Sequence, residues 1–252
     1  MNNSFLSDRC QEVILGSLLG DGSLRIQRPY VNARFSFRHT IQSEDYFFWK
    51  IAQLKEISSE HCFWKQASNG YGGAMLRYQS LATPELTALY RYTHRHNRLV
   101  ILRRWLNQLT PLSLAIWWCD DGSLIGPGSR RGVFCTDSFS LDAQKILARY
   151  LSVVWKITVA IGKIHRERDG VVHEYYRLWI RSSEELKKFL RIILPHIPVA
   201  AMLPKVLLLY KDSQLQQRWI SEILERTSFS REVVERYLLA KRARHRDFQN
   251  MI

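Results

Sequence analysis

One short phrase occurs twice in this chain of 252 residues, and its two copies lie one hundred residues apart. An apolar run over 14–20 leads into Asp21-Gly22-Ser23, and a second run over 114–120 leads into Asp121-Gly122-Ser123. Glycine after the acid allows the chain to leave a helix sharply. A carboxylate at the C-terminal end of a helix is poorly matched to the helix dipole. The same unfavourable placement, made twice, indicates that a cation lies between two acids.

The order of elements after each copy is also repeated. We expect helices over 9–20 and 111–120, and each should be followed by two strands, a second helix, two more strands and a third helix. The second helix should begin after Ser43 in the first copy and after Ser140 in the second. The clearest strand is 31–41, where apolar and polar residues alternate strictly. Because strands pair before helices intervene, the fold class is α+β with antiparallel sheets in two αββαββα repeats. We expect repeats over 1–108 and 109–212, with a helical stretch over 84–109, and a basic helical extension over 213–252.

Small residues in both runs favour close packing of the two helices that end in the acids. Gly16 and Gly20 are four residues apart in the first run, as are Ala115 and Cys119 in the second. Close packing brings Asp21 and Asp121 together at one end, where hard oxygen ligands suit Mg²⁺ or Mn²⁺. Trp117 and Trp118 lie inside the second run and are expected in the core.

The charge of the chain favours a polyanionic partner. Lys and Arg number 37 against 23 acids, which gives a net charge of +14, and 26 of the 37 are Arg. Such an excess is typical of nucleic-acid-binding proteins, although a basic protein without that role remains an alternative. Four cysteines without a CxxC pair argue against a zinc site or a disulfide framework and favour a reducing, intracellular compartment, either organellar or prokaryotic. No apolar run has membrane-spanning length, so no membrane partner is expected.

The two phrases resemble the paired motifs of the LAGLIDADG homing endonucleases. TPLSLAIWWCDDGS resembles the second motif of the branch that reads TP-x-x-LA-x-W-F-x-DDG, and ILGSLLGDGSLR resembles its first motif. The resemblance covers about residues 9–210. It implies a monomer with pseudo-twofold symmetry, motif helices packed at the interface of the repeats, and two saddle-shaped sheets over the DNA major groove. It also implies a divalent metal and double-strand cleavage that leaves short 3′ overhangs.

The resemblance assigns roles residue by residue. Asp21 and Asp121 become the metal ligands, and Gly20 and Asp120 offer backbone carbonyls, with the Asp120 side chain the weaker candidate because its counterpart is Gly20. The basic residue near each scissile phosphate becomes Lys205, in AMLPK, and Arg98, with Arg95 as an alternative. The family usually has Lys there, so Arg98 is a departure. The expected DNA-contacting residues on the polar strand faces are Arg25, Arg28, Arg34, Arg38, Arg77, Lys163, His165, Arg177 and Arg181.

Other readings of the sequence stay open. An intron-encoded RNA maturase uses the same fold, and a catalytically silent DNA-binding regulator would need a broken metal site. His94-Arg95-His96-Asn97 resembles an HNH nuclease only superficially. The last two helices, 214–225 and 231–244, resemble a helix-turn-helix loosely, or form a hairpin that packs on the core and presents a basic face.

Overall fold

Helix α1 (Asp8–Leu18) begins where its cap predicts, because the Ser7 side chain accepts a hydrogen bond from the backbone N–H of Cys10. The computed structural model describes residues 6–67, 73–168 and 170–250, with side chains up to residue 244. The turns expected around 69–73 and at Asp169 therefore lie wholly or largely outside the described residues, as does the side chain of Arg246. Two compact units, Met1–Asp121 and Gly122–Ile252, divide the chain.

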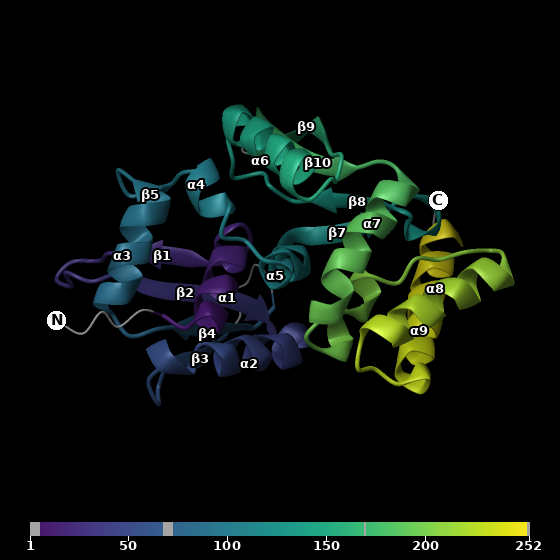
Figure 1. The fold of residues 1–252 in the computed structure, drawn as a ribbon, viewed down its shortest axis with the longest axis horizontal. Coiled ribbons are helices and arrows are strands. Elements are labelled where there is room, and N and C mark those ends of the chain that lie inside the picture. Colours follow the sequence, from purple (N-terminus) through teal and green to yellow (C-terminus); the bar gives the residue numbers. More distant parts are fainter. Residues whose placement is uncertain (1–5, 68–72, 169, 251–252) are drawn as a thin grey trace. The chain divides into compact units, whose positions relative to one another are not determined.

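The first unit contains one antiparallel sheet of four strands with helices packed on it. Its strands are β1 (Ser23–Arg25), β2 (Arg34–Thr40), β3 (Phe63–Gln66) and β4 (Met75–Gln79), in the spatial order β1-β2-β4-β3. Helix α2 (Glu44–Gln53) packs on β2 and β4, and α3 (Pro84–Thr93) packs on β1 and β2 (Figure 1). Two 3-10 turns, η1 (Ile41–Ser43) and η2 (Lys55–Ile57), flank α2.

The alternation expected in 31–41 is confirmed in β2 and wrong at its ends. Phe35, Phe37 and His39 are buried, whereas the residues between them face out. The strand begins only at Arg34, however, and Val31 is 82% exposed. The turn at Arg28 and Pro29 lies just before, and residues 31 and 32 form a bend, so residue 31 lies outside the strand and its apolar side chain reaches solvent.

The helical stretch expected over 84–109 is wrong, because a hairpin interrupts it. Helix α3 stops at Thr93, and β5 (His94–Arg95) pairs with β6 (Arg98–Leu99) before the short α4 (Arg103–Leu106). The hairpin turns at His96 and Asn97, whose φ angles are 48° and 60°. Asn and His tolerate this left-handed region better than most residues, and helical periodicity alone does not reveal it.

The two motif helices pack as closely as their small residues predict. A Cβ on Gly16 of α1 would lie 2.4 Å from the Ser113 carbonyl oxygen of α5 (Pro111–Asp121), and one on Gly20 would lie 2.5 Å from the Asp120 Cβ. Ser113 Oγ also donates a hydrogen bond to the Glu12 carbonyl at 3.0 Å. Trp117 and Trp118 are fully buried, which confirms their expected place in the core.

The second unit repeats the topology of the first. Strands β7 (Gly122–Ile125), β8 (Arg131–Phe134), β9 (Ala160–Arg168) and β10 (Val171–Ile180) form an antiparallel sheet in the order β7-β8-β10-β9. Helices α6 (Leu141–Val154) and α7 (Ser183–Ile193) pack on β10. Short 3-10 segments are η3 (Pro127–Ser129), η4 (Leu194–His196) and η5 (Ala200–Lys205). The identical strand order in both units confirms the predicted α+β fold of two αββαββα repeats.

The chain ends in a helical hairpin that packs on the second unit. Helices α8 (Ser213–Arg226) and α9 (Arg231–Asn250) contact each other, and α9 contacts η5. Val234 and Leu238 of α9 are buried. Of the two interpretations of the tail, the packed hairpin is therefore the one the structure supports. None of the described helices is both long and apolar enough to span a bilayer.

Candidate metal site and nucleic-acid interface

The polar face of the first sheet is hollowed beside the first motif acid. The hollow has a volume of about 440 Å³, and its lining includes Asp21 together with Arg25, Arg38 and Arg77. Three of the expected DNA-contacting residues thus share one surface with an expected metal ligand. Gln27, Trp64 and Gln79 add polar and aromatic groups to the same lining.

Like charges lie opposite each other across this sheet. Arg25 pairs in register with Arg34, and Arg38 pairs with Arg77. Arg34 also donates to Gln79 at 3.1 Å and stacks 4.0 Å from the ring centre of Tyr30. Cross-strand pairs of like charge destabilise a sheet unless an anion compensates them. The arrangement therefore gathers several positive charges on one face of the sheet.

Three candidate ligand groups meet at the end of α1. One atom each from Asp21, His39 and Asp120 lies within 4.8 Å of the others. His39 Nδ1 is 3.5 Å from Asp21 Oδ2, and His39 Nε2 is 3.9 Å from Asp120 Oδ1. The Asp21 side chain is 41% exposed and reaches the hollow, whereas the Asp120 side chain is fully buried.

A buried lysine holds the Asp120 carboxylate. Lys50 Nζ of α2 donates to both Asp120 oxygens at 2.9 Å, and both side chains are fully buried. Tyr46 Oη donates to the same carboxylate at 2.9 Å. Burial first, and then the charge of Asp120, raise the pKa of Tyr46 well above its usual range, so this hydroxyl remains a donor. The backbone N–H of Asp21 approaches Asp120 Oδ2 at 3.4 Å.

These contacts define what each acid can do. The Asp120 side chain already accepts hydrogen bonds from Lys50 and Tyr46, so it competes less well for a metal than the Asp21 side chain does. Asp21 presents its carboxylate to the hollow, and Asp121 ends α5 half-buried. Carboxylate and carbonyl oxygens at these two helix ends form a hard donor set that suits Mg²⁺ or Mn²⁺.

The two expected basic residues lie in different local structures. Lys205 ends η5, and its Nζ donates to the Gly122 carbonyl at 3.0 Å. Arg98 is exposed on β6 and pairs in register with Arg95. Arg95 instead bends back to the carbonyls of Arg91 and His94, each at 2.6 Å. Arg98 therefore remains the better candidate of the two.

The residues expected to read DNA in the second unit do not share one face. Lys163 pairs with Tyr176 and His165 with Glu174, on the face of buried Leu178. Arg177 pairs with Gly162 on the opposite face. A shift of one residue in strand register moves a side chain to the other face, so a list drawn from both parities cannot form one surface.

Two of these cations in the second unit also form ion pairs with acidic side chains. Lys163 Nζ is 2.6 Å from Glu174, and that hydrogen bond lowers the pKa of Glu174. Arg177 Nη2 donates to Asp137 at 2.7 Å, and the same pairing holds the pKa of Asp137 below its usual range. Arg166 reaches Asp137 at 2.9 Å. Arg28 and Arg181 are exposed in loops.

Comparison with known proteins shows which family the chain belongs to. Residues 11–189 match the family described as LAGLIDADG DNA endonucleases. The chain belongs to this family. Among solved structures, the homing endonuclease I-WcaI bound to its DNA recognition sequence has a TM-score of 0.67 at 18% identity, and the match covers 80% of this chain and 88% of that one.

Curated relatives match over most of this chain but over less of their own length. Protein RecA of Mycobacterium gastri is 30% identical over 205 residues, which is 76% of this chain and 46% of the relative. The cytochrome b mRNA maturase bI2 of Saccharomyces cerevisiae is 26% identical over 78% of this chain and 48% of its own. The chain thus spans about half the length of these relatives. The corresponding maturase of Debaryomyces hansenii is 24% identical, and 73% of its length is matched.

In this LAGLIDADG protein, two residues near the motif acids are not evident from the sequence: His39, beside Asp21 and Asp120, and Lys50, beside Asp120. Alternation places His39 on the apolar face of its strand, and Lys50 lies within α2 without any motif around it. One sequence feature points to His39: it is a polar residue on the otherwise apolar, buried face of its strand. Lys50 gave no signal, because its burial depends on Asp120, which lies 70 residues away.

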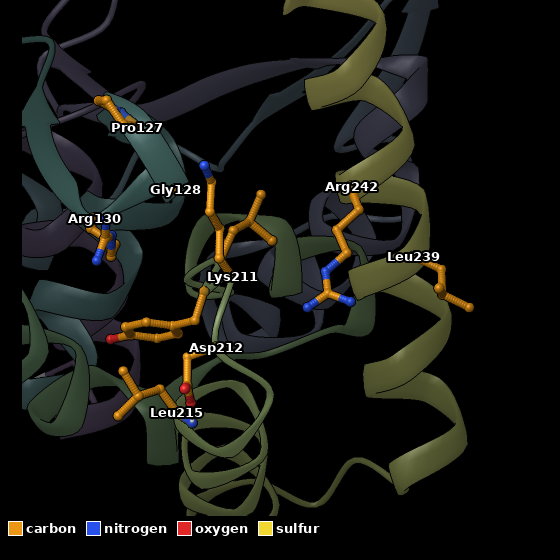
Figure 2. A pocket seen from close by; sticks show the side chains of 10 residues that line it. Pro127, Gly128, Arg130, Lys211, Asp212, Leu215, Leu239 and Arg242 are labelled. Atoms are coloured by element: carbon orange, nitrogen blue, oxygen red, sulfur yellow. Dashed lines mark hydrogen bonds between the residues drawn. The ribbon is translucent and has the colours of Figure 1, made fainter.

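The second unit contains a further hollow, with a volume of about 830 Å³ (Figure 2). Arg130, Lys211 and Arg242 line it with apolar side chains that include Leu215 and Leu239. Figure 2 shows Arg242 extending from α9 toward the linker that carries Lys211 and Asp212. The hollow lies on the tail side of the repeat and contains none of the expected site residues.

Replacing the arginines of the first hollow is expected to weaken DNA binding and flatten its salt dependence. Arg38→Gln combined with Arg77→Gln should reduce the log–log salt slope by about 0.9 per lost phosphate contact. Fluorescence anisotropy with duplex DNA across a salt series measures the slope. Arg91→Gln, which removes an exposed charge from α3, is the matched control. Equal losses in both variants would contradict a specific role for this face.

Proposed function

We propose that this protein is a site-specific homing endonuclease that makes metal-dependent double-strand breaks in a long DNA target. One observation carries the proposal. The carboxylate of Asp21 opens on the same hollow as Arg25, Arg38 and Arg77, so a phosphate held by the arginines lies beside a candidate metal ligand. Family membership supports DNA as the substrate, and the solved relative I-WcaI is described as bound to its DNA recognition sequence.

The residues divide the chemistry among them. Asp21 and Asp121, with the carbonyls of Gly20 and Asp120, would hold the divalent ions, which supply an activated water and neutralise charge on the scissile phosphate when bound. His39 keeps the Asp21 carboxylate oriented through its Nδ1. Arg38 and Arg77 hold the DNA backbone against the sheet and reduce its charge repulsion.

The two DNA strands would be cut with the help of different basic residues. Lys205 is a compact cation that can lose a proton, whereas Arg98 stays protonated and can only stabilise charge. We therefore assign Lys205 to one scissile phosphate and Arg98 to the other, and we expect a nicked intermediate to accumulate. The protein would act as a monomer, since both motifs lie in one chain.

A cleavage assay on a pooled random-target library tests the proposal. We expect a single family of related sites to be cut in Mg²⁺ or Mn²⁺, with no cutting in EDTA. Sequencing the ends gives the overhang, and end-labelling each strand gives the two rates. Binding of duplex DNA without cutting in any divalent metal would contradict the endonuclease and favour a silent DNA-binding protein.

An RNA maturase is the second candidate function, because two of the relatives are cytochrome b mRNA maturases. In that case the basic sheet faces would hold a host intron RNA, and the protein would be encoded within that intron. Competition separates the two functions, since a maturase prefers structured intron RNA to duplex DNA of equal length at one salt concentration. Preference for the duplex would leave the endonuclease as the function.

A further inference from the structure

The segment that carries Lys205 receives its hydrogen bonds from the C-terminal hairpin. Trp219 Nε1 of α8 donates to the Val206 carbonyl at 3.0 Å, and Gln216 Nε2 donates to the Leu208 carbonyl at 3.1 Å. Backbone carbonyls that leave a short 3-10 helix need donors from elsewhere. Side chains from a part of the chain outside the repeats therefore fix the backbone that follows Lys205.

Lys241 of α9 makes the contacts that bracket Lys205 itself. Its Nζ donates to the carbonyls of Pro204 and Leu207, each at 2.7 Å. One acceptor belongs to the residue immediately before Lys205, and the other belongs to the second residue after it. The two bonds therefore clamp the backbone on both sides of Lys205.

The position of Lys241 is chemically costly. Burial lowers the pKa of its ammonium group to about 7, because the charge leaves water to face neutral carbonyl dipoles. Buried Val234 and Leu238 hold α9 against the core on the same helix. A methionine or leucine would pack there without this electrostatic cost, so the amine is used for its donors. The sequence indicated a solvated basic face for this helix, and Lys241 departs from it.

The side chain held by this clamp is also directed by the fold. Lys205 Nζ donates to the carbonyl of Gly122, the residue that follows Asp121 in the sequence. A fixed backbone at 204–207 is what keeps that amine at one place. A displacement of about 1 Å at a reacting group costs on the order of a hundredfold in rate, so small movements of this segment matter.

We propose that Lys241 is a positioning residue, through which the C-terminal hairpin holds Lys205 in place for cleavage of one DNA strand. The inference rests on the proposed role of Lys205. It assigns the extension a task in catalysis rather than in DNA affinity. Exposed cations of the same helix, such as Arg236, have no part in it.

Strand-resolved cleavage of a target recovered from the library tests the proposal. Lys241→Met should slow the strand that Lys205→Met slows, by about tenfold or more, and leave the other strand unchanged. The double variant Lys205→Met/Lys241→Met should be no slower than Lys205→Met alone, because both act through one group. Lys241→Arg, which keeps the donors, should recover part of the rate. Arg236→Met, which removes one charge from the same helix, is the control and should leave both strand rates unchanged.

Hydrogen exchange of the intact protein provides a readout that does not depend on cleavage. Amides of residues 205–209 should exchange faster in Lys241→Met than in the wild type or in Arg236→Met. Unchanged exchange, or equal slowing of both strands, would overturn the proposal. If Lys205→Met leaves both rates intact while exchange rises in Lys241→Met, the role of Lys205 fails and the clamp stands. If Lys241→Met does not fold, Lys241→Gln takes its place in each comparison.

Discussion

Asp21→Asn and Asp121→Asn are each expected to abolish double-strand cleavage while DNA stays bound. The substitution preserves shape and removes one negative charge, so a divalent ion loses a strong oxygen ligand at the end of a motif helix. Removing a negative charge beside the arginines of the first hollow should not weaken their attraction for phosphates. We expect the dissociation constant for target DNA in Ca²⁺ to stay within about tenfold of the wild type, or 1.4 kcal/mol.

Plasmid cleavage and gel-shift titration measure the two properties separately. Asp8→Asn is the matched control, because Asp8 is exposed in the first turn of the same helix as the first motif and carries the same charge. Full-rate cutting by either motif variant would remove that acid from the metal site. Loss of cutting in Asp8→Asn as well would point to a general effect of charge.

Lys50→Met is expected to destabilise the protein by about 3–5 kcal/mol, since it leaves the Asp120 carboxylate buried without its cation. Both side chains are fully buried and joined by two bonds of 2.9 Å. Tyr46 would still donate to the carboxylate, but it carries no charge that could compensate it. Equilibrium urea unfolding, followed by fluorescence, measures the loss.

The double variant Lys50→Met/Asp120→Leu separates the ion pair from the packing. Removing both charges together should recover most of the lost stability, because no buried charge is left uncompensated. Lys55→Met, an exposed lysine just after α2, should leave the free energy of unfolding nearly unchanged. A double variant as unstable as Lys50→Met would mean that overall packing, rather than the unpaired charge, accounts for the loss.

Most of the fold follows from local patterns in the sequence. The helix start after Ser140, the alternation in β2, and the small residues of the motif helices each predict a feature that the structure confirms. The hairpin at His94–Leu99 could not be read, because its turn depends on left-handed backbone at His96 and Asn97 rather than on Gly. The prediction that Val31 is buried in the strand was wrong for a related reason. The apolar–polar alternation extends to residue 31, whereas strand pairing in β2 begins only at Arg34.

The site was less accessible to sequence reasoning than the fold. The motif acids stand out because the phrase is duplicated, and their chemical assignment remains a prediction. The prediction was least accurate for the sheet face of residues in β9 and β10. Lys163 and Arg177 both lie on strands with alternating side chains, and only the strand register shows that they point to opposite faces. Lys50 and Lys241 could not be predicted, since each is held by hydrogen-bond partners far away in the chain.

The meeting point of Gly20 and Asp120 limits how this protein can be made symmetric. A Cβ at position 20 would lie 2.5 Å from the Asp120 Cβ, so the crossing admits one side chain and not two. Two fused copies of the first repeat would oppose glycine with glycine and leave each Lys50 buried without an acid. Two copies of the second would force a pair of aspartates into the same space. A version of this protein with two identical halves therefore requires a change at 20, 50 or 120 before either half can be duplicated.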